Sequence, residues 1–237
     1  MLLRSLPETD IAGAVIQSLE EYCMKNIQDS YILMISGGRS PIQVFEKFKN
    51  SKIPWSKFDL YWMDERCVPL DHLESNYRLV YETFLKEFLE VGILTEEQIH
   101  PILSDASKDD LGISLNHKML NNIPVVDFLI TGVGEDGHVG SLFPRNEALK
   151  IREKNLIPIF NSPKLPERRI TFSREVFETA QQAHVLFIGD SKSQAFHNFL
   201  DPDTSVEDCP VKMFQQVKEL FVYTPFSEQR TGNSGQR

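Results

Sequence analysis

Cysteine is scarce in this chain of 237 residues, and the three cysteines are not paired. Cys23, Cys67 and Cys209 are widely spaced, and none stands in a Cys-x-x-Cys arrangement. Disulfide-rich domains and structural zinc sites both need cysteines in pairs or clusters, so the sequence predicts neither. Three reduced thiols are typical of a cytoplasmic protein, and we expect that location.

Long apolar runs and an excess of positive charge are also missing. No stretch approaches the roughly 20 apolar residues that span a bilayer, and residues 1–8 lack the core of a signal peptide. With 25 Lys and Arg against 34 Asp and Glu, the formal net charge is −9. This charge argues against nucleic acid or an anionic membrane as a partner, so an anionic substrate must be held by a few local cations.

Short apolar runs instead alternate with helical patterns, which is typical of βαβ units around a parallel sheet. We expect strands at 31–36, 58–63, 125–131, 168–172, 184–189 and 219–223. Two helices with an apolar face are expected. One face comprises Ile11, Val15, Leu19 and Tyr22, and the other comprises Tyr77, Tyr81, Phe84, Leu85 and Phe88. The predicted fold is a single α/β domain over residues 1–226, with a Rossmann-like, open, mainly parallel sheet flanked by helices. Residues 227–237 are predicted to form a flexible tail.

The segment 131–144 carries the strongest functional pattern. It follows the apolar run 125–130 and contains glycines at 132, 134, 137 and 140. Such glycines let a backbone turn sharply and approach a ligand closely. Asp136 and His138 add a carboxylate and an imidazole within the same turn, so we expect a functional site at this strand end.

A second glycine turn follows the expected strand 31–36. Gly37 and Gly38 free backbone N–H groups to point at an oxyanion, and the positive end of the next helix dipole favours the same charge. Ser40 is predicted to cap that helix, with Pro41 as its first residue. A tight turn without a ligand is the alternative interpretation.

A third strand end leads from the run 59–63 into Asp64, Glu65 and Arg66, and Ser75 and Asn76 then open a helix. Taken alone, the charged triplet is slightly more typical of a solvated run than of a site. In an open parallel sheet, however, the carboxyl ends of neighbouring strands border one crevice, where ligands bind. We therefore expect the three strand ends to share one site.

Together these segments resemble the 6-phosphogluconolactonase family, part of a larger group with glucosamine-6-phosphate deaminase. The family pattern Ser-Gly-Gly-Ser-Thr-Pro appears at 36–41, with Arg39 in place of a serine. The Asp-Glu-Arg and Ser-Asn motifs are present, and Gly-x-Gly-x-Asp-Gly-His-x-x-Ser-Leu-Phe-Pro is matched throughout 132–144. Segments 162–171 and 189–192 are similar to later family motifs. That resemblance implies that Arg169 and Lys192 bind phosphate together with the backbone of Gly37, Gly38 and Ser40.

The larger group divides at the fifth position after the histidine. Deaminases resemble Asp-Gly-His-x-x-Phe-Asn-Glu-Pro, which places there a glutamate that serves in a proton relay. This chain has Phe143 at that position. The resemblance therefore favours the lactonase branch, while a deaminase and a sugar-phosphate-binding module without turnover stay as alternatives.

Lactone hydrolysis needs a base for the attacking water and a place for an oxyanion. We predict His138 as the base and Asp136 as a group that orients the loop or the histidine. Asp64 is predicted to position water or bind a sugar hydroxyl, and Arg66 to stabilise negative charge or hold the Asp64 loop. Arg39 is predicted to contact phosphate. No metal-ligand spacing or cofactor motif is evident, so we expect direct water attack without either.

The predicted reaction converts 6-phospho-D-glucono-1,5-lactone to 6-phospho-D-gluconate, the second step of the oxidative pentose phosphate pathway. The expected partner is this small-molecule substrate, and the expected assembly is a monomer or small homo-oligomer. The five other histidines are expected in loops or helices without matching partners, at positions 72, 100, 117, 184 and 197. Cys67 is predicted to be a small buried residue.

Overall fold

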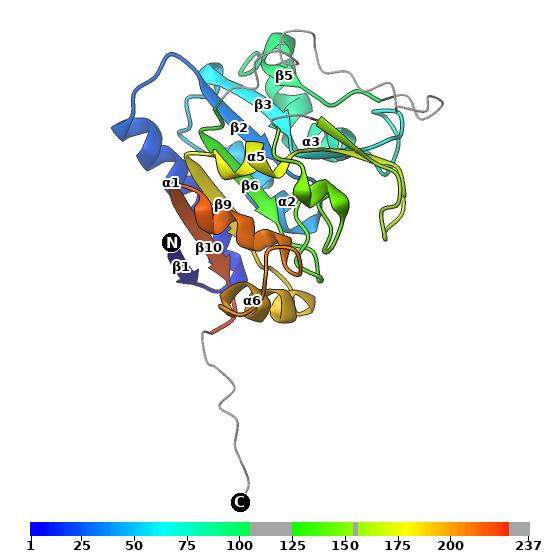
Figure 1. Cartoon of the computed structure of the whole chain (residues 1–237). Coiled ribbons are helices and arrows are strands. Elements are labelled where there is room, and N and C mark those ends of the chain that lie inside the picture. Colours follow the sequence, from blue (N-terminus) through cyan, green and yellow to red (C-terminus); the bar gives the residue numbers. More distant parts are fainter. Residues whose placement is uncertain (105–124, 154–155, 228–237) are drawn as a thin grey trace, which may run out of the picture.

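The computed structural model describes residues 1–104, 125–153 and 156–227. Seven parallel strands form the central sheet (Figure 1), in the order β1-β10-β9-β6-β2-β3-β5. These strands are β1 (Leu2–Ser5), β2 (Tyr31–Ile35), β3 (Phe58–Trp62), β5 (Ile99–His100), β6 (Phe128–Gly132), β9 (Gln182–Leu186) and β10 (Glu219–Thr224). The predicted α/β class with a mainly parallel sheet is confirmed.

A second, smaller sheet is antiparallel, with the order β4-β8-β7. Its strands are β4 (Asp64–Arg66), β8 (Arg169–Phe172) and β7 (Leu156–Ile159). The strand expected at 168–172 is therefore present, but it lies outside the parallel sheet where we had placed it. Met63 joins the two sheets, since its N–H donates to Ile35 O at 2.8 Å and its carbonyl accepts from Phe172 N at 2.9 Å.

Strands β1, β4, β5 and β7 were not predicted, because each is too short or too polar to give an apolar run. β4, for instance, consists of three charged residues. Its pairing with β8 comes from contacts between distant parts of the chain, which local pattern does not report.

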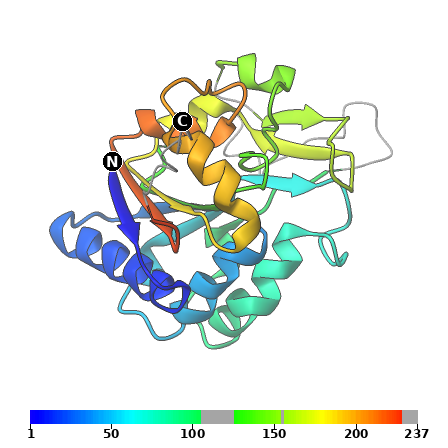
Figure 2. The same ribbon diagram turned by 90° about the horizontal axis from the view of Figure 1, so that it is seen from below.

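Helices cover both faces of the parallel sheet (Figure 2). α1 (Glu8–Lys25), α2 (Arg39–Phe48), α3 (Asn76–Val80) and α4 (Lys86–Glu90) lie on one side, and α5 (Arg174–Glu178) and α6 (Ser193–Leu200) on the other. The apolar face of α1 is buried as predicted, with Ile11, Val15 and Leu19 at 0% exposure. The second predicted face spans α3, a π-helical turn at Tyr81–Leu85 and α4, and its members Phe84, Leu85 and Phe88 are buried.

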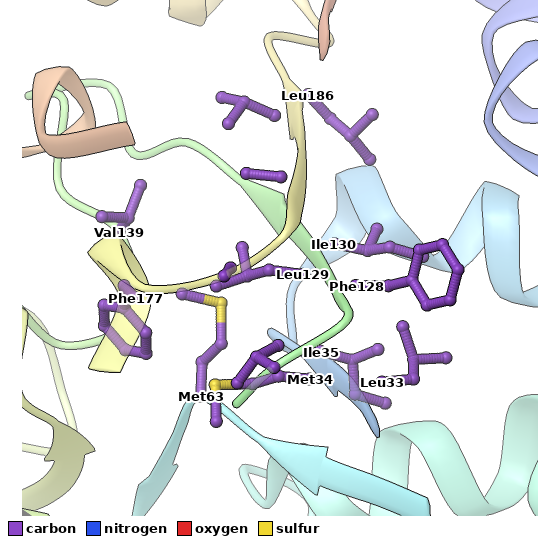
Figure 3. Close-up of a cluster of buried hydrophobic side chains, with 14 of the residues drawn as sticks. Leu33, Met34, Ile35, Met63, Phe128, Leu129, Ile130, Val139, Phe177 and Leu186 are labelled. Atoms are coloured by element: carbon purple, nitrogen blue, oxygen red, sulfur yellow. The ribbon is translucent and has the colours of Figure 1, made fainter. Parts of the chain in front are cut away.

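The core continues from the sheet directly beneath the predicted site. Leu33, Ile35 and Ile130 are fully buried in the central strands, and Val139 packs into the same cluster from the glycine-rich segment (Figure 3). Val139 follows His138 in the chain, so its burial fixes the histidine loop onto the sheet. Burying such a side chain contributes about 1.5–3 kcal/mol.

Two predictions concern residues outside the described ranges: most of the tail, from 228 to 237, and His117. The single-domain boundary at 226 stays a prediction. Among the described residues, no helix has the length and apolar character needed to cross a membrane.

Candidate active site

A cavity of about 560 Å³ opens at the carboxyl ends of β2, β3, β6 and β9. The turns after these parallel strands line it, as the crevice rule for open sheets predicts. All predicted site residues but Asp136 line the cavity, namely Gly37, Gly38, Arg39, Ser40, Asp64, Arg66, His138, Arg169 and Lys192. The prediction that three strand ends share one crevice is confirmed.

The turn from β2 into α2 differs from the prediction. Gly38 is the residue that precedes the helix, with φ at 97°, and α2 begins at Arg39 with no side-chain cap. Ser40 is therefore not the cap, because the positive φ of Gly38 turns the chain into the helix two residues earlier. With no capping side chain, the first N–H groups of α2 are available to an anion in the cavity.

The neighbouring Gly37 is required by close packing. A Cβ atom built there would lie 1.9 Å from Asn76 Oδ1. Asn76 is buried at the start of α3 and lines the cavity, so this glycine lets the turn after β2 approach the segment that follows β3.

His138 and Asp136 form a direct pair. His138 Nδ1 lies 2.5 Å from Asp136 Oδ1, which also accepts from His138 N at 3.3 Å. The turn is closed by hydrogen bonds from Gly134 N to His138 O and from Gly137 N to Gly134 O, at 2.8 and 3.0 Å. Since Nδ1 is engaged by Asp136, the ring nitrogen left for a ligand is Nε2. Asp136 itself lies behind the histidine rather than on the cavity wall.

The charge of Asp136 is set by this pair. Burial acts to raise the pKa of Asp136, but the hydrogen bond and charge of His138, with Lys164 in addition, lower it to about 2. Asp136 is therefore ionised at neutral pH. An ionised carboxylate fixes the tautomer and orientation of the imidazole that it faces.

Phe143 occupies the position of the deaminase glutamate and packs against the histidine. Its ring centroid lies 4.6 Å from that of His138, and its side chain is 2% exposed. The guanidinium of Arg169 also lies over the ring of Phe143, 5.5 Å from its centroid. An apolar ring thus stands where an acid would be needed for the deaminase relay.

Asp64 is buried at 4% exposure and fixed by neighbours from two other segments. Its Oδ2 accepts from Ser141 Oγ at 2.6 Å, and Asn76 Nδ2 donates to its backbone carbonyl at 2.9 Å and to Oδ1 at 3.3 Å. The solvated-run interpretation of residues 64–66 is therefore wrong for Asp64, whose carboxylate is held rigidly at the cavity wall.

Glu65 is also buried, and it has a structural role at the start of α3. Its carboxylate accepts from Asn76 N at 2.7 Å, Tyr77 N at 2.8 Å and Ser75 Oγ at 3.0 Å. Burial raises its pKa, an effect that backbone N–H donors from Asn76, Tyr77 and Arg66 partly offset. The carboxylate thus satisfies the free N–H groups of the helix, as a cap does.

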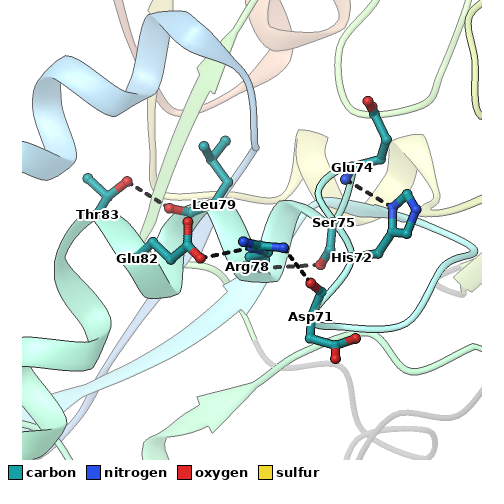
Figure 4. A network of polar contacts seen from close by, with 8 residues as sticks. All are labelled: Asp71, His72, Glu74, Ser75, Arg78, Leu79, Glu82 and Thr83. Carbon is teal, nitrogen blue, oxygen red and sulfur yellow. Dashed lines mark hydrogen bonds and ion pairs between the residues drawn. The ribbon is translucent and has the colours of Figure 1, made fainter.

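The loop before α3 is tied down by a further polar network (Figure 4). Arg78 donates to Asp71 O at 2.7 Å and to Glu82 at 2.8 Å, while His72 Nδ1 accepts from Glu74 N at 3.1 Å. Glu74 in turn offers its carbonyl to Arg66 Nη1 at 2.7 Å. Arg66 therefore lines the cavity while also holding the loop beside Asp64.

The cavity lining is rich in cations, namely Arg39, Arg66, Lys164, Arg169 and Lys192. Burial lowers the pKa of Lys192, Glu135 opposes that effect, and the nearby charges of Lys164 and Arg39 lower it further. Different charges act on Arg169. Burial lowers its pKa, and among the nearby charges Asp64, which raises the pKa, and Arg66, which lowers it, have the largest effects. The charges that act on Lys192 thus differ from those that act most strongly on Arg169.

The guanidinium of Arg169 is largely occupied by the protein itself. Its Nε donates to Pro166 O at 3.0 Å, and its Nη2 donates to the carbonyls of Lys164 and Leu165 at 3.1 Å each. Only Nη1 is left without a hydrogen bond among the described residues. Arg169 therefore organises the loop 162–167 in addition to lining the cavity.

Several cavity residues were missed at the level of sequence. They include Gln43, Ser191, Leu165, Lys164 and Glu8, whose carboxylate accepts from Gly189 N at 3.0 Å. Ser191 lies in the turn 189–192 that carried part of the resemblance, and Gln43 lies in α2 after the Gly37 and Gly38 turn, but neither was singled out. Glu8 follows no glycine turn, so the signal used could not find it. Lys164 stands inside the proline-rich motif that carried part of the resemblance, and that motif was the available pointer to it.

The structure also tests the predictions for the other histidines and for Cys67. His100 and His184 lie on strands, not in loops or helices, and both have partners: Asp59 for His100 at 2.9 Å and Tyr223 for His184 at 3.1 Å. Cys67 is buried as predicted, and burial raises the pKa of its thiol. Among the described residues, no three His, Cys, Asp or Glu side chains are grouped to hold a metal ion.

Comparison with known families decides the relationship. The model of the family described as glucosamine-6-phosphate isomerases/6-phosphogluconolactonase matches residues 7–222. The chain belongs to this family. The family predicted from the three strand-end motifs is thereby confirmed.

Members of this family with curated names are similar over most of their length. A 6-phosphogluconolactonase of Rattus norvegicus is 32% identical over 201 residues, which cover 81% of this chain and 77% of that protein. One of Borreliella burgdorferi is 29% identical over 191 residues, with 80% and 81% covered. Among solved structures, the 6-phosphogluconolactonase of Leishmania guyanensis has a TM-score of 0.77 at 19% identity, covering 94% of this chain and 96% of that one. At that identity the likeness establishes the shared fold.

Proposed function

We propose that this member of the family hydrolyses 6-phospho-D-glucono-1,5-lactone to 6-phospho-D-gluconate. The single observation that carries the proposal is Phe143 packed on His138, at 4.6 Å between ring centroids. The apolar ring removes the acid that ring opening of an amino sugar would use, yet leaves the His138–Asp136 pair intact at the cavity. The 6-phosphogluconolactonase names of the curated relatives support the same branch.

In the proposed mechanism, His138 Nε2 accepts a proton from water as the water oxygen attacks C1 of the lactone. The C1 carbonyl becomes a tetrahedral oxyanion, which then collapses and breaks the bond between C1 and the ring oxygen. The imidazolium returns its proton to that leaving oxygen, and the product is a carboxylic acid that ionises. Asp136, ionised behind Nδ1, stabilises the imidazolium between the two transfers.

The phosphate group is proposed to bind at the N-terminus of α2. The supporting features are the uncapped first turn after Gly38 and the cations Arg39 and Lys192, which both line the cavity. Arg169 contributes its free Nη1, and its main effect is to hold the loop 162–167. Backbone N–H groups and guanidinium forks are well suited to phosphate oxygens.

Asp64 is proposed to bind a sugar hydroxyl or the attacking water through the carboxylate that Ser141 and Asn76 hold in place. Arg66 is proposed to keep the Asp64 segment in position, since it bonds to Glu74 O. A place in the oxidative pentose phosphate pathway follows from the proposed substrate. Cytoplasmic location and a monomeric or small oligomeric state remain predictions, and some relatives are named as chloroplastic.

The test generates the lactone from glucose 6-phosphate with a dehydrogenase and follows its disappearance above the spontaneous rate. We expect acceleration by the wild type and a loss of about 10² to 10⁴ in kcat for His138→Ala. The control is His197→Ala, because His197 is a surface residue whose ring bonds within its own helix to Ser193 O. Equal rates for wild type and His138→Ala would refute the proposed base. No acceleration by the wild type would leave a binding module or a deaminase.

A further inference from the structure

Lys164 is the cation of the cavity that the mechanism above does not use. It lies on the loop 162–167, which leads from β7 towards β8, and its side chain lines the cavity. The next residue, Leu165, is 80% exposed, so the loop tip stands at the mouth of the cavity. Among the described residues, Lys164 Nζ has no hydrogen-bond or ion-pair partner.

The backbone of Lys164 is held unusually firmly for a loop tip. Ser162, buried at 6% exposure, accepts from Lys164 N at 3.2 Å and donates to Lys164 O at 2.8 Å through the same hydroxyl. Arg169 Nη2 donates to that carbonyl from the other side at 3.1 Å. A hydrogen bond from Ser162 N to Glu167 O, at 3.1 Å, also closes the loop. The protein thus fixes the origin of the side chain and leaves its ammonium group for a ligand.

Lys164 lines the same cavity as His138 and Lys192. Burial and His138 dominate the pKa of Asp136, and burial dominates that of Lys192, but the positive charge of Lys164 lowers both. Lys164 therefore lies within electrostatic reach of the histidine pair and of the proposed phosphate subsite. In the substrate, C1 and the phosphate are linked through the ring oxygen, C5 and C6, so the lactone must span the space between these two parts.

We propose that Lys164 is a catalytic residue whose ammonium group stabilises the oxyanion formed on C1 when water adds to the lactone. This inference rests on the proposed function. As the water proton moves to His138 Nε2, negative charge moves to the former carbonyl oxygen, and Lys164 compensates it without giving up a proton. When the intermediate collapses, the C1=O double bond re-forms, and the electron pair of the broken bond goes to the ring oxygen, which takes the proton from the His138 imidazolium. A donor placed for charge that develops only in the transition state acts on kcat.

The test compares Lys164→Met and Lys164→Arg with Lys192→Met, the contrasting phosphate-subsite variant. Two quantities are measured: kcat for the phosphorylated lactone, and the Kd of glucose 6-phosphate by calorimetry. Glucose 6-phosphate has the same phosphate and ring but no carbonyl at C1. Lys150→Met is the matched control, because Lys150 is an exposed lysine paired with Glu147 outside the cavity.

We expect Lys164→Met to lower kcat about tenfold or more while the Kd of glucose 6-phosphate changes less than about twofold. Lys164→Arg should recover part of the rate, and Lys192→Met should weaken glucose 6-phosphate binding. A parallel loss of glucose 6-phosphate affinity in Lys164→Met would make Lys164 a phosphate ligand and overturn the inference. Unchanged kcat would overturn it as well. A wild type without lactonase activity would instead refute the proposed function, and the inference with it.

Thermal unfolding of each variant accompanies these measurements. The contacts that hold the loop use the backbone of Lys164, not its side chain. Lys164→Met should therefore unfold at the wild-type temperature, so a fall in kcat reports on the ammonium group.

Discussion

His138 and His184 are both held by a neighbouring side chain, but they differ in what lies on the other side of the ring. His138 Nδ1 meets Asp136 at 2.5 Å, and the ring borders the cavity. His184 lies in β9 at 0% exposure, with Nδ1 3.1 Å from Tyr223 Oη and Nε2 3.4 Å from Gln182 Oε1. Both nitrogens of His184 are thus occupied inside the protein, whereas His138 keeps one for a ligand.

The electrostatic surroundings of the two rings also differ. Asp136, whose pKa is lowered to about 2, places an anion beside His138 Nδ1. Burial, with a smaller effect of Arg4, lowers the pKa of His184 to about 3, so this ring stays neutral. The comparison shows why His138 is the proposed base, since one nitrogen is anchored by a carboxylate and the other is left for a ligand in the cavity. A histidine enclosed on both sides is part of the core.

The largest loss of activity is expected from Gly134→Ala, which disturbs the His138–Asp136 pair. A Cβ atom at position 134 would lie 1.9 Å from His138 Nδ1 and 2.6 Å from Asp136 Oδ1, so both side chains must move from their present positions. We expect kcat for the lactone to fall about 10²- to 10³-fold. Gly13→Ala is the control, because nothing lies within 4 Å of its Cβ position on α1, and it should raise stability by up to about 1 kcal/mol. Wild-type turnover by Gly134→Ala would show that the pair is not needed.

A smaller loss is expected from Asp136→Asn, which keeps the shape of the pair and removes its charge. The imidazolium formed during water attack loses its anionic partner, so kcat should fall by about a hundredfold. Steady-state kinetics should show KM changed much less than kcat, because Asp136 lies off the cavity wall. A change confined to KM would mean that Asp136 contributes to binding and not to proton transfer.

The smallest effect is expected at His184 and appears in stability rather than rate. Between its unfolded pKa of about 6.5 and its folded pKa of about 3, the unfolded chain binds a proton that the folded protein does not. Acidification therefore destabilises the fold, by about 2 kcal/mol from pH 6.0 to 4.5. Urea unfolding of His184→Gln should lack this contribution, while activity at neutral pH stays near the wild-type value. Equal acid sensitivity of both proteins would contradict the assignment.

Much of the fold was predictable because its signals are local. Each of the six expected strands overlaps an observed one, since runs such as 31–35 and 128–130 are largely buried and therefore apolar. The short strand β4 was hidden because Asp64, Glu65 and Arg66 resemble a solvated run. They form a strand because β8, about a hundred residues away, supplies the pairing.

The site was predictable to the extent that it is built from strand ends. Gly37, Asp64 and His138 were found because parallel strands bring their carboxyl ends to one edge. Lys164 was not found, because it comes from the antiparallel sheet and reaches the cavity through a loop held by Arg169. The contact between Asp136 and His138 was likewise open until the turn around Gly137, with φ at 83°, placed them together.

The sequence by itself determined the α/β class, the family and the types of chemical group available at the site. These follow from apolar periodicity and from short motifs whose residues act on their immediate neighbours. Only the tertiary structure decided which groups face the cavity. In the folded protein, the buried carboxylate of Glu65 accepts from N–H groups at the start of a helix, and most of the Arg169 guanidinium holds a loop. His138 Nε2 and Lys164 Nζ have no hydrogen-bond partner among the described residues. Such choices depend on burial and on hydrogen bonds between segments far apart in the chain, which a linear pattern does not encode.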